Sequence, residues 1–224
     1  MQVILSDVSQ GPNGRALPLT SLEFHSGSAA LVPAETERRP TVLGLIASGR
    51  MRPDTGTVRL NGEADAAGLR LRVALVDAPD VSDPAADVTV ARVVAEELSF
   101  AGRLGTGRAT RNVLAGLGLL EQARLPMANL PPAARIRLLV ELALLRDGVE
   151  AVVITAPDRH GGDPLAWWQL AQEIAGRGYA VLVIAGAAAV AVIEAGDSGL
   201  TGSTTPVLNA AQNPASLPEG GDTP

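Results

Sequence analysis

The stretch from Pro33 to Pro40 (PAETERRP) has the place and polarity of a loop that could bind phosphate, between a short apolar run and a helical pattern. A phosphate loop here would read G-x-x-x-x-G-K-[ST]. Its glycines let backbone N–H groups close on the phosphates, its lysine neutralises them, and its hydroxyl holds Mg²⁺. In this chain Pro33 and Arg38 stand at the two glycine positions. Arg39 stands at the lysine position and Pro40 at the hydroxyl position.

These replacements remove the groups that would hold a triphosphate. Arg38 places a side chain where the backbone must approach the ligand, and Pro40 lacks an N–H that an anion would use. Glu35, Thr36 and Glu37 fill the middle of the loop, and the two glutamates add negative charge. Each charge-assisted hydrogen bond contributes about 1.5–3 kcal/mol, against roughly 8 kcal/mol for a micromolar complex. We therefore expect that ATP does not bind here in the manner of a phosphate loop.

The elements around this loop follow a definite order. An apolar strand at Ala29–Val32 leads into the loop, a helix is expected over Thr41–Ser48, and a Pro-Asp-x-Gly turn precedes a strand that ends in Asn-Gly at position 62. This order resembles the opening of an ATP-binding cassette (ABC) transporter ATPase domain. The resemblance covers about Gln2–Asp197. It implies an α/β, P-loop NTPase-like fold with a mainly parallel central sheet flanked by helices, an antiparallel β-subdomain and a helical subdomain at about 79–147.

The resemblance also assigns three further motif positions, at which the chain departs from the family pattern. They are the signature at a helix start, the aspartate-glutamate pair that holds Mg²⁺ and polarises the attacking water, and the histidine that contacts the γ-phosphate. The residues at these positions are, in that order, Pro131, Pro132 and Ala133; Thr155 and Ala156; and Gly186. We therefore expect no catalytic residue, no cofactor and no bound metal.

One polar motif position is retained. The run Gly161–Pro164 (GGDP) matches the family turn Gly-Leu-Asp-Pro, which implies that Asp163 contacts a partner domain. Asp163 is equally explained as the cap of a helix over Leu165–Arg177. Trp167 and Trp168, the only tryptophans, lie on this helix. Core packing is their default interpretation, whereas an exposed ring would mark a contact surface.

Composition limits the function further. The 224 residues carry a formal net charge of -6 and 2% aromatic residues, which argues against a nucleic-acid-binding protein. Cysteine is absent, and all eighteen basic residues apart from histidine are arginine, so no phosphate-loop lysine exists anywhere in the chain. The N-terminus lacks a signal-peptide pattern. The longest apolar run, Tyr179–Ile193, is too short to span a membrane and predicts a strand and then a helix, divided at Gly186.

Apolar periodicity predicts the remaining elements. Strands are expected at Gln2–Asp7, Leu19–Phe24, Leu69–Val76, Glu150–Pro157 and Gly178–Ala185, and helices at Val88–Gly102, Arg108–Leu120 and Ile136–Arg146. A proline-containing loop carries four aspartates, Asp77, Asp80, Asp83 and Asp87, which we interpret as a solvated acidic loop because their spacing is not that of a calcium site. Residues 1–197 are expected to form the ABC-ATPase-like domain, and residues 198–224 a largely flexible Gly/Ser/Pro-rich tail.

The leading functional hypothesis is a catalytically inactive ABC-type pseudo-ATPase that serves as a protein-binding or structural subunit. Its expected partner is an integral membrane protein or another ABC ATPase domain, with a homodimer as a further option. We expect it in the cytoplasm, either free or attached to the inner face of the cell membrane without insertion into it. One alternative is a phosphate- or nucleotide-binding enzyme that uses Arg38 and Arg39 in a different pose. Another is the degenerate half of an ABC ATPase heterodimer.

Overall fold

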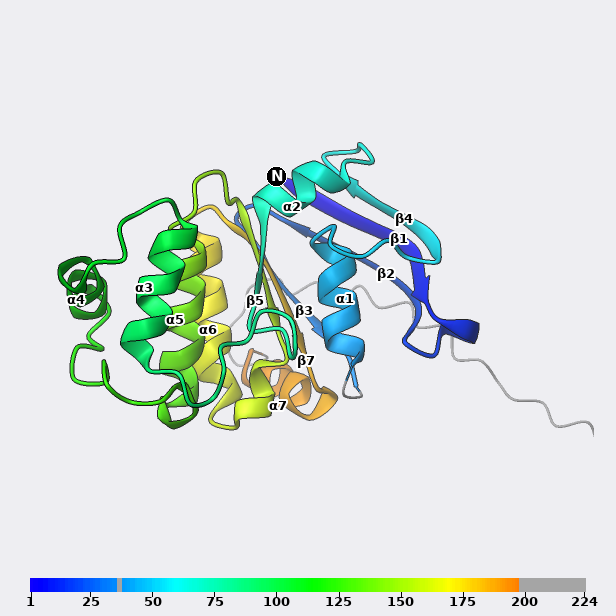
Figure 1. Cartoon of the computed structure of the whole chain (residues 1–224). Coiled ribbons are helices and arrows are strands. Elements are labelled where there is room, and N and C mark those ends of the chain that lie inside the picture. The colour runs from blue at the N-terminus through cyan, green and yellow to red at the C-terminus, as the bar shows by residue number, and fades with distance from the viewer. Residues whose placement is uncertain (36–37, 198–224) are drawn as a thin grey trace, which may run out of the picture.

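The computed structural model describes residues 1–35 and 38–197, which form two β-sheets with helices between and around them (Figure 1). Thr36 and the tail at 198–224 lie outside the described residues. The central sheet is parallel, with strand order β3-β7-β6-β5. Its strands are β3 (Ala29–Pro33), β5 (Val73–Val76), β6 (Ala151–Thr155) and β7 (Ala180–Ala185). Every residue of β5, β6 and β7 is buried, because helices cover both faces of this sheet.

The second sheet is antiparallel and has the order β2-β1-β4. It consists of β1 (Gln2–Gln10), β2 (Leu17–His25) and β4 (Thr55–Leu60), and a short 3-10 helix, η1 (Pro12–Gly14), joins its first two strands. The two sheets together with the flanking helices confirm the predicted α/β architecture.

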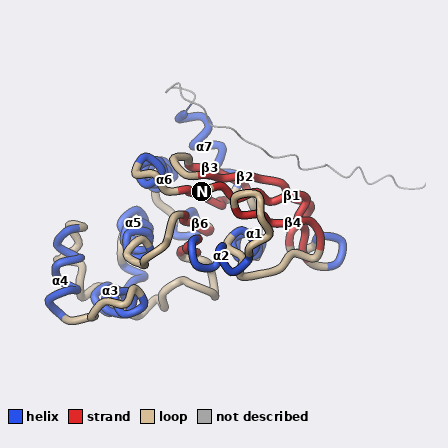
Figure 2. The backbone as a smooth tube through the Cα atoms, turned by 90° about the horizontal axis from the view of Figure 1, so that it is seen from above, coloured by secondary structure: helices blue, strands red, loops and turns tan. Residues whose placement is uncertain are grey.

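Helix α1 (Arg39–Ala47) lies between the two sheets, and the other long helices lie beyond the parallel sheet (Figures 1 and 2). An alanine-sized side chain at Gly44 would place its Cβ 2.9 Å from Leu75 Cδ1 and 3.0 Å from Thr155 Oγ1. Glycine at this position therefore allows α1 to pack closely on β5 and β6. One hydrophobic core surrounds α1, and a second core fills the opposite side of the parallel sheet.

The second core is covered by α5 (Pro132–Ala143), α6 (Pro164–Gly176) and α3 (Val90–Phe100). Helix α4 (Gly107–Gly116) packs outside α3, and α7 (Ala187–Asp197) covers β3 beside α6. Two further 3-10 helices are η2 (Met127–Asn129) and η3 (Pro157–His160). Thr89 caps α3 by accepting a hydrogen bond from the Arg92 N–H. Among the described residues no helix combines the length and apolar character required to cross a bilayer.

The prediction of a strand over Leu69–Val76 is wrong in its first half. A helix, α2 (Ala66–Arg72), occupies that half, and the strand is limited to β5. Asp65 starts the helix, because its side chain accepts a hydrogen bond from the Gly68 N–H at 2.8 Å. The alternation of leucine and arginine suggested a strand, but Leu69 is buried while Leu71 is 74% exposed. The cap and the helical burial pattern therefore override the apparent two-residue period.

Candidate functional site

The carboxyl ends of the parallel strands bring the predicted motif positions together at one edge of the sheet. Pro33 ends β3 and pairs in register with Ala185, the last residue of β7. Thr155 ends β6 and pairs with Ile184. Gly186 follows directly, so the positions expected for the phosphate loop, the aspartate-glutamate pair and the histidine are neighbours. This edge is where open parallel sheets bind their ligands.

Two carboxylates occupy backbone donors at this edge. Glu35 Oε1 accepts a hydrogen bond of 2.8 Å from the Ala187 N–H, across 152 residues of sequence. Asp158 Oδ2 accepts one of 3.2 Å from the Gly186 N–H. These N–H groups lie at the start of α7, where the positive end of a helix dipole favours an anion. The protein's own acidic side chains thus take the donors that a bound phosphate could use.

The end of β6 carries a hydroxyl but no carboxylate. Thr155 is fully buried, and its Oγ1 has no hydrogen-bond partner among the described residues. Ala156 adopts a left-handed backbone conformation with φ 48°, which is costly for a residue with a Cβ. Neither side chain carries a carboxylate that could hold Mg²⁺ or polarise a water molecule.

The start of α1 places the two arginines of the loop at the same edge. Arg38 is exposed and immediately precedes the helix, Arg39 is half-buried, and Pro40 is buried in the first turn. No side chain caps this helix start among the described residues. Arg39 Nε is buried without a hydrogen-bond partner in the same part of the chain. The positive charges are therefore present, but Pro40 provides no N–H beside them.

The positions assigned to the signature lie at the start of α5. Pro131 precedes the helix and Pro132 begins it, while Ala133 is exposed. A Cβ added at Gly162 would lie 3.2 Å from Pro132 Cβ, so the turn before α6 packs against this helix start. Asp163 caps α6 by accepting a hydrogen bond of 2.9 Å from the Leu165 N–H. The capping role predicted for Asp163 is therefore confirmed, and its predicted partner contact stays a prediction.

Both tryptophans lie in the core of the chain. Trp167 is 1% exposed and Trp168 is 3% exposed, within the hydrophobic cluster between the parallel sheet and α5. Neither indole N–H has a hydrogen-bond partner among the described residues. The default expectation of core packing is confirmed, and neither ring marks a contact surface on the isolated chain.

A buried ion-pair cluster beside this edge was not predicted. Asp77 follows β5, and its side chain is fully buried, which corrects the interpretation of this residue as part of a solvated loop. Its Oδ1 accepts a hydrogen bond of 2.8 Å from Arg135 Nη2 on α5, and its Oδ2 lies 2.7 Å from His160 Nε2. Arg159 Nη2 lies 3.1 Å from Asp77 Oδ1 and 3.5 Å from Asp83 Oδ2. The cluster joins β5, α5 and η3.

Electrostatics keep the Asp77 carboxylate charged. Burial by itself would raise the pKa of Asp77, but the hydrogen bonds from His160 and Arg135 and the charge of Arg159 lower this pKa below its ordinary value of 3.8. Asp80, Asp83 and Asp87 are exposed, as predicted for the rest of the loop. One aspartate of the four therefore has a structural role.

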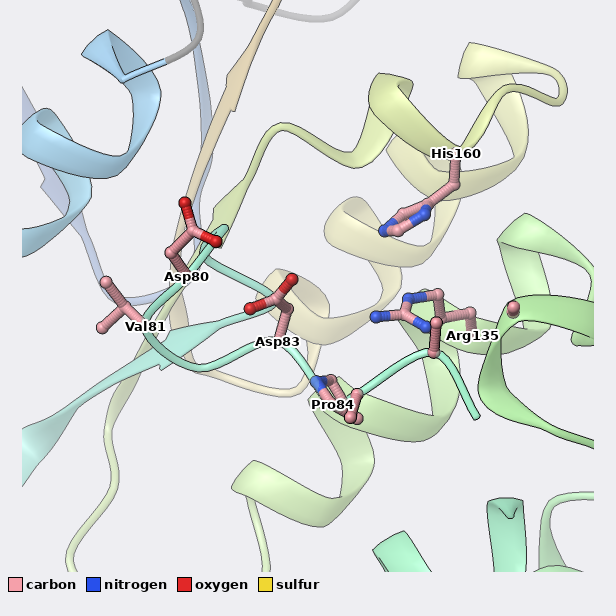
Figure 3. Close-up of a pocket in the computed structure, with 9 residues that line it drawn as sticks. Asp80, Val81, Asp83, Pro84, Arg135 and His160 are labelled. Atoms are coloured by element: carbon pink, nitrogen blue, oxygen red, sulfur yellow. The ribbon is translucent and has the colours of Figure 1, made fainter. Parts of the chain in front are cut away.

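A cavity of about 590 Å³ adjoins the cluster between the acidic loop and α5. Asp83, Arg135 and His160 face one another across it, and Asp80 lies farther along the loop (Figure 3). Pro84, Ala85, Ala86 and Ala128 line the remaining wall. The cavity carries both charges but holds no nucleophile and no set of three metal-ligating side chains within the described residues.

Comparison with solved structures identifies the architecture. The first similar structure, an ATP-binding subunit of an ABC transporter, has a TM-score of 0.56 and 20% identity over 85% of this chain and 82% of its own. CbiO1 of Clostridium perfringens, part of the ABC transporter complex CbiONQ, has a TM-score of 0.58 and 16% identity over 82% of this chain and 77% of its own. A nucleotide-free ATP-binding cassette from an ABC transporter has a TM-score of 0.61 and 14% identity over 87% and 85%.

The chain has the ABC ATPase fold. A scan against protein-family models found no match, and no curated protein sequence is significantly similar. These structures share 20% sequence identity or less with the chain, so the similarity shows its fold but not its function.

The sequence predicted where the site lies but not which residues bond to one another within it. Glu35 was expected to add negative charge, but its bond to α7 depends on chain segments 152 residues apart. Asp158 lies beyond the end of β6, and its bond to Gly186 depends on the turn made by η3. Within α5, Arg135 is the charged residue that is buried, whereas Arg137 and Glu141 are half-buried, and sequence alone did not separate the three. A buried arginine requires a nearby carboxylate.

Proposed function

We propose that this chain is a non-catalytic ABC-type pseudo-ATPase that acts as a protein-binding or structural subunit of a membrane-associated or transporter complex. The observation that supports this most is the occupation of the α7 donors by Glu35 and Asp158. A triphosphate at this edge would have to displace two carboxylates and would meet their charge. Repulsion between like charges would oppose this, more at Asp158, whose hydrogen bond is partly buried, than at Glu35, which is exposed.

The residues of the three further motif positions support the same proposal. Thr155 and Ala156 supply no carboxylate at the end of β6, and Gly186 supplies no side chain after β7. The two prolines at the start of α5 supply no N–H group there. Arg38 and Arg39 are positive replacements, but two arginines followed by a proline do not provide the glycine backbone that forms the cradle of a phosphate loop. We infer that the motifs are degenerate and that catalysis is absent.

The exposed apolar side chains favour a protein partner. Phe100 is 74% exposed and Leu104 is 82% exposed, at and just after the end of α3, and Leu120 beyond α4 is 47% exposed. Exposed large apolar side chains can mark interaction sites, and Phe100 and Leu104 are close together in the sequence. CbiO1, one of the similar structures, is part of a transporter complex. We propose that the region from α3 to α4 contacts an integral membrane protein or another ABC ATPase domain from the cytoplasmic side.

Calorimetric titration with Mg·ATP tests the catalytic part of the proposal. We expect no saturable heat and no phosphate release, because the donors and ligands for the triphosphate are absent or occupied. A catalytically active ABC ATPase domain, titrated under the same conditions, is the positive control. Tight, Mg²⁺-dependent binding with turnover would refute the proposal.

The same titration separates the two alternatives. Binding of ATP that is lost on replacing Arg38 and Arg39 with alanine would favour an anion-binding enzyme that uses these arginines. ATP binding to a mixture with an active ABC ATPase domain that is tighter, or has more sites, than binding to that active domain alone would favour the degenerate half of a heterodimer. Neither result is expected from a pseudo-ATPase with a scaffolding role.

Co-purification from native membranes tests the partner surface. We expect a membrane protein to be enriched with the unchanged chain and lost with the double variant F100S/L104S, because the exposed apolar side chains supply the contact. The matched control is L19S, which replaces a leucine that is 50% exposed on β2 of the antiparallel sheet. Equal recovery with F100S/L104S and L19S would exclude this surface.

A further inference from the structure

A second cavity, of about 550 Å³, lies at the opposite end of α1 from the phosphate-loop positions. It is enclosed by the C-terminal end of α1, the segment that follows it, β4 and α2. The nine residues of α1 separate the two places by about 13 Å. A volume of this size is within the range of small-molecule sites, roughly 300–1,000 Å³.

The floor of this cavity is apolar and rigid. Ile46 and Leu69 are buried at 0% and 1% exposure, and Met51 and Val58 are half-buried beside them. Gly49 has a φ of 70°, and a Cβ there would lie 2.7 Å from Leu69 Cβ. The backbone turn therefore fits closely against α2 and fixes the wall of the cavity.

The rim carries an excess of positive charge. Arg50, Arg52 and Arg70 line it, and Asp54 is the one acidic residue that does. Asp54 is already engaged, because its Oδ2 accepts a hydrogen bond of 2.7 Å from the Gly11 N–H. The chain as a whole has a net charge of -6, so the positive charge of this rim is opposite in sign to that of the whole chain.

None of the three arginines has a carboxylate partner among the described residues. Arg50 Nη1 donates to the carbonyl oxygens of Ser48 and Val73, at 3.2 and 2.9 Å. Arg70 Nη1 donates to the Gly49 carbonyl at 3.1 Å. Carbonyl oxygens satisfy the N–H groups but leave the charge without a counterion. Some arginines elsewhere in the described residues do have a glutamate partner, as Arg72, Arg137 and Arg177 do.

Arg50 lies among other positive charges. Partial burial lowers its pKa, and the neighbouring positive charges of Arg146 and Arg70 lower this pKa further. An anion in the cavity would stabilise the charged form. Arg52, which is exposed and makes no hydrogen bond or ion pair with the described residues, is available to bind it.

We propose that this cavity binds a small organic anion, with an acidic group held by Arg52 and Arg70 and an apolar body against Met51 and Val58, the partly exposed apolar residues of the lining. Arginine forks hold carboxylate and phosphate oxygens in a bidentate manner, and the apolar floor supplies the remaining binding energy. No aromatic residue lines the cavity, so it offers no stacking surface for a nucleobase. The site is separate from the nucleotide edge and does not depend on the proposed pseudo-ATPase role.

Calorimetric titration with octyl phosphate and octanoate tests this site. We expect saturable binding of both anions with one site per chain. Inorganic phosphate should bind roughly tenfold or more weakly, because it lacks the apolar body. The double variant R52Q/R70Q should weaken the binding of octyl phosphate by roughly tenfold or more, because a charge-assisted hydrogen bond is lost at each position.

The controls distinguish this site from general adhesion of an octyl chain. The variant R111Q replaces an exposed arginine of α4, outside the cavity, and should bind octyl phosphate like the unchanged chain. Should R52Q/R70Q unfold, the single variant R52Q tests the same point, since Arg52 has no partner among the described residues. Equal affinity for octylammonium, equal affinity of R52Q, or the absence of saturable binding would overturn the proposal.

Discussion

Replacing Asp77 with asparagine is expected to lower the free energy of unfolding by about 3–5 kcal/mol. The variant D77N removes the charge and keeps the size of the side chain. Asparagine also tolerates the left-handed backbone conformation of this residue, whose φ is 56°. The loss arises because the Arg135 side chain is only 6% exposed and would remain buried without its counterion. Urea unfolding followed by circular dichroism measures it.

A double variant provides the control. Replacing Arg135 with methionine in D77N removes the uncompensated charge, so D77N/R135M should recover much of the stability that D77N loses. Arg159 and His160 remain 24% and 22% exposed at their side chains, and water can therefore solvate them. If D77N were as stable as the unchanged chain, the buried cluster would not stabilise the joint between β5 and α5.

The pH dependence of stability checks the same charge independently. The pKa of Asp77 is lower in the folded state than its ordinary value of 3.8. Its contribution to stability is therefore present above pH 3.8 and is lost as the pH falls through the lower folded pKa. The stability of D77N should fall less steeply on the acid side. Parallel acid profiles of the two proteins would contradict the assignment.

Replacing Trp167 with alanine is expected to lower the free energy of unfolding by about 3–5 kcal/mol, because the change leaves a large cavity in the core. Trp167 is 1% exposed and lies in the cluster between the parallel sheet and α5. Thermal and urea unfolding of the isolated chain measure the effect, which needs no partner protein.

The variant W167F is the matched control. Phenylalanine fills most of the space, and the indole N–H of Trp167 has no hydrogen-bond partner among the described residues, so no hydrogen bond is lost. The loss for W167F should be clearly smaller than that for W167A. Had Trp167 been part of a contact surface, W167A would weaken a complex and leave the isolated chain nearly as stable as before, which is the result that would contradict core packing.

The sequence states directly which residues stand at the motif positions. It has Arg39 where a phosphate loop has lysine, and Thr155 where the family pattern has aspartate at the end of the strand. The order of strands and helices was predictable for a related reason, since apolar periodicity and the caps Thr89 and Asp163 are local signals. The one error in type, at Leu69–Val76, arose where two periodicities fit the same short run.

Tertiary structure decided which groups meet. The bond of Glu35 to α7 and the ion pairs of Asp77 with Arg135 and Arg159 join segments 58 to 152 residues apart, and their partners are set by how β3, β5 and α5 pack. The pattern of neighbouring residues does not show which distant segments pack together. A charged residue is therefore expected to be exposed to solvent unless the tertiary structure buries it beside a partner. The sequence by itself thus determined which residue types stand at the motif positions, whereas only the folded chain decided that Glu35 and Asp158 accept hydrogen bonds from the backbone at the start of α7.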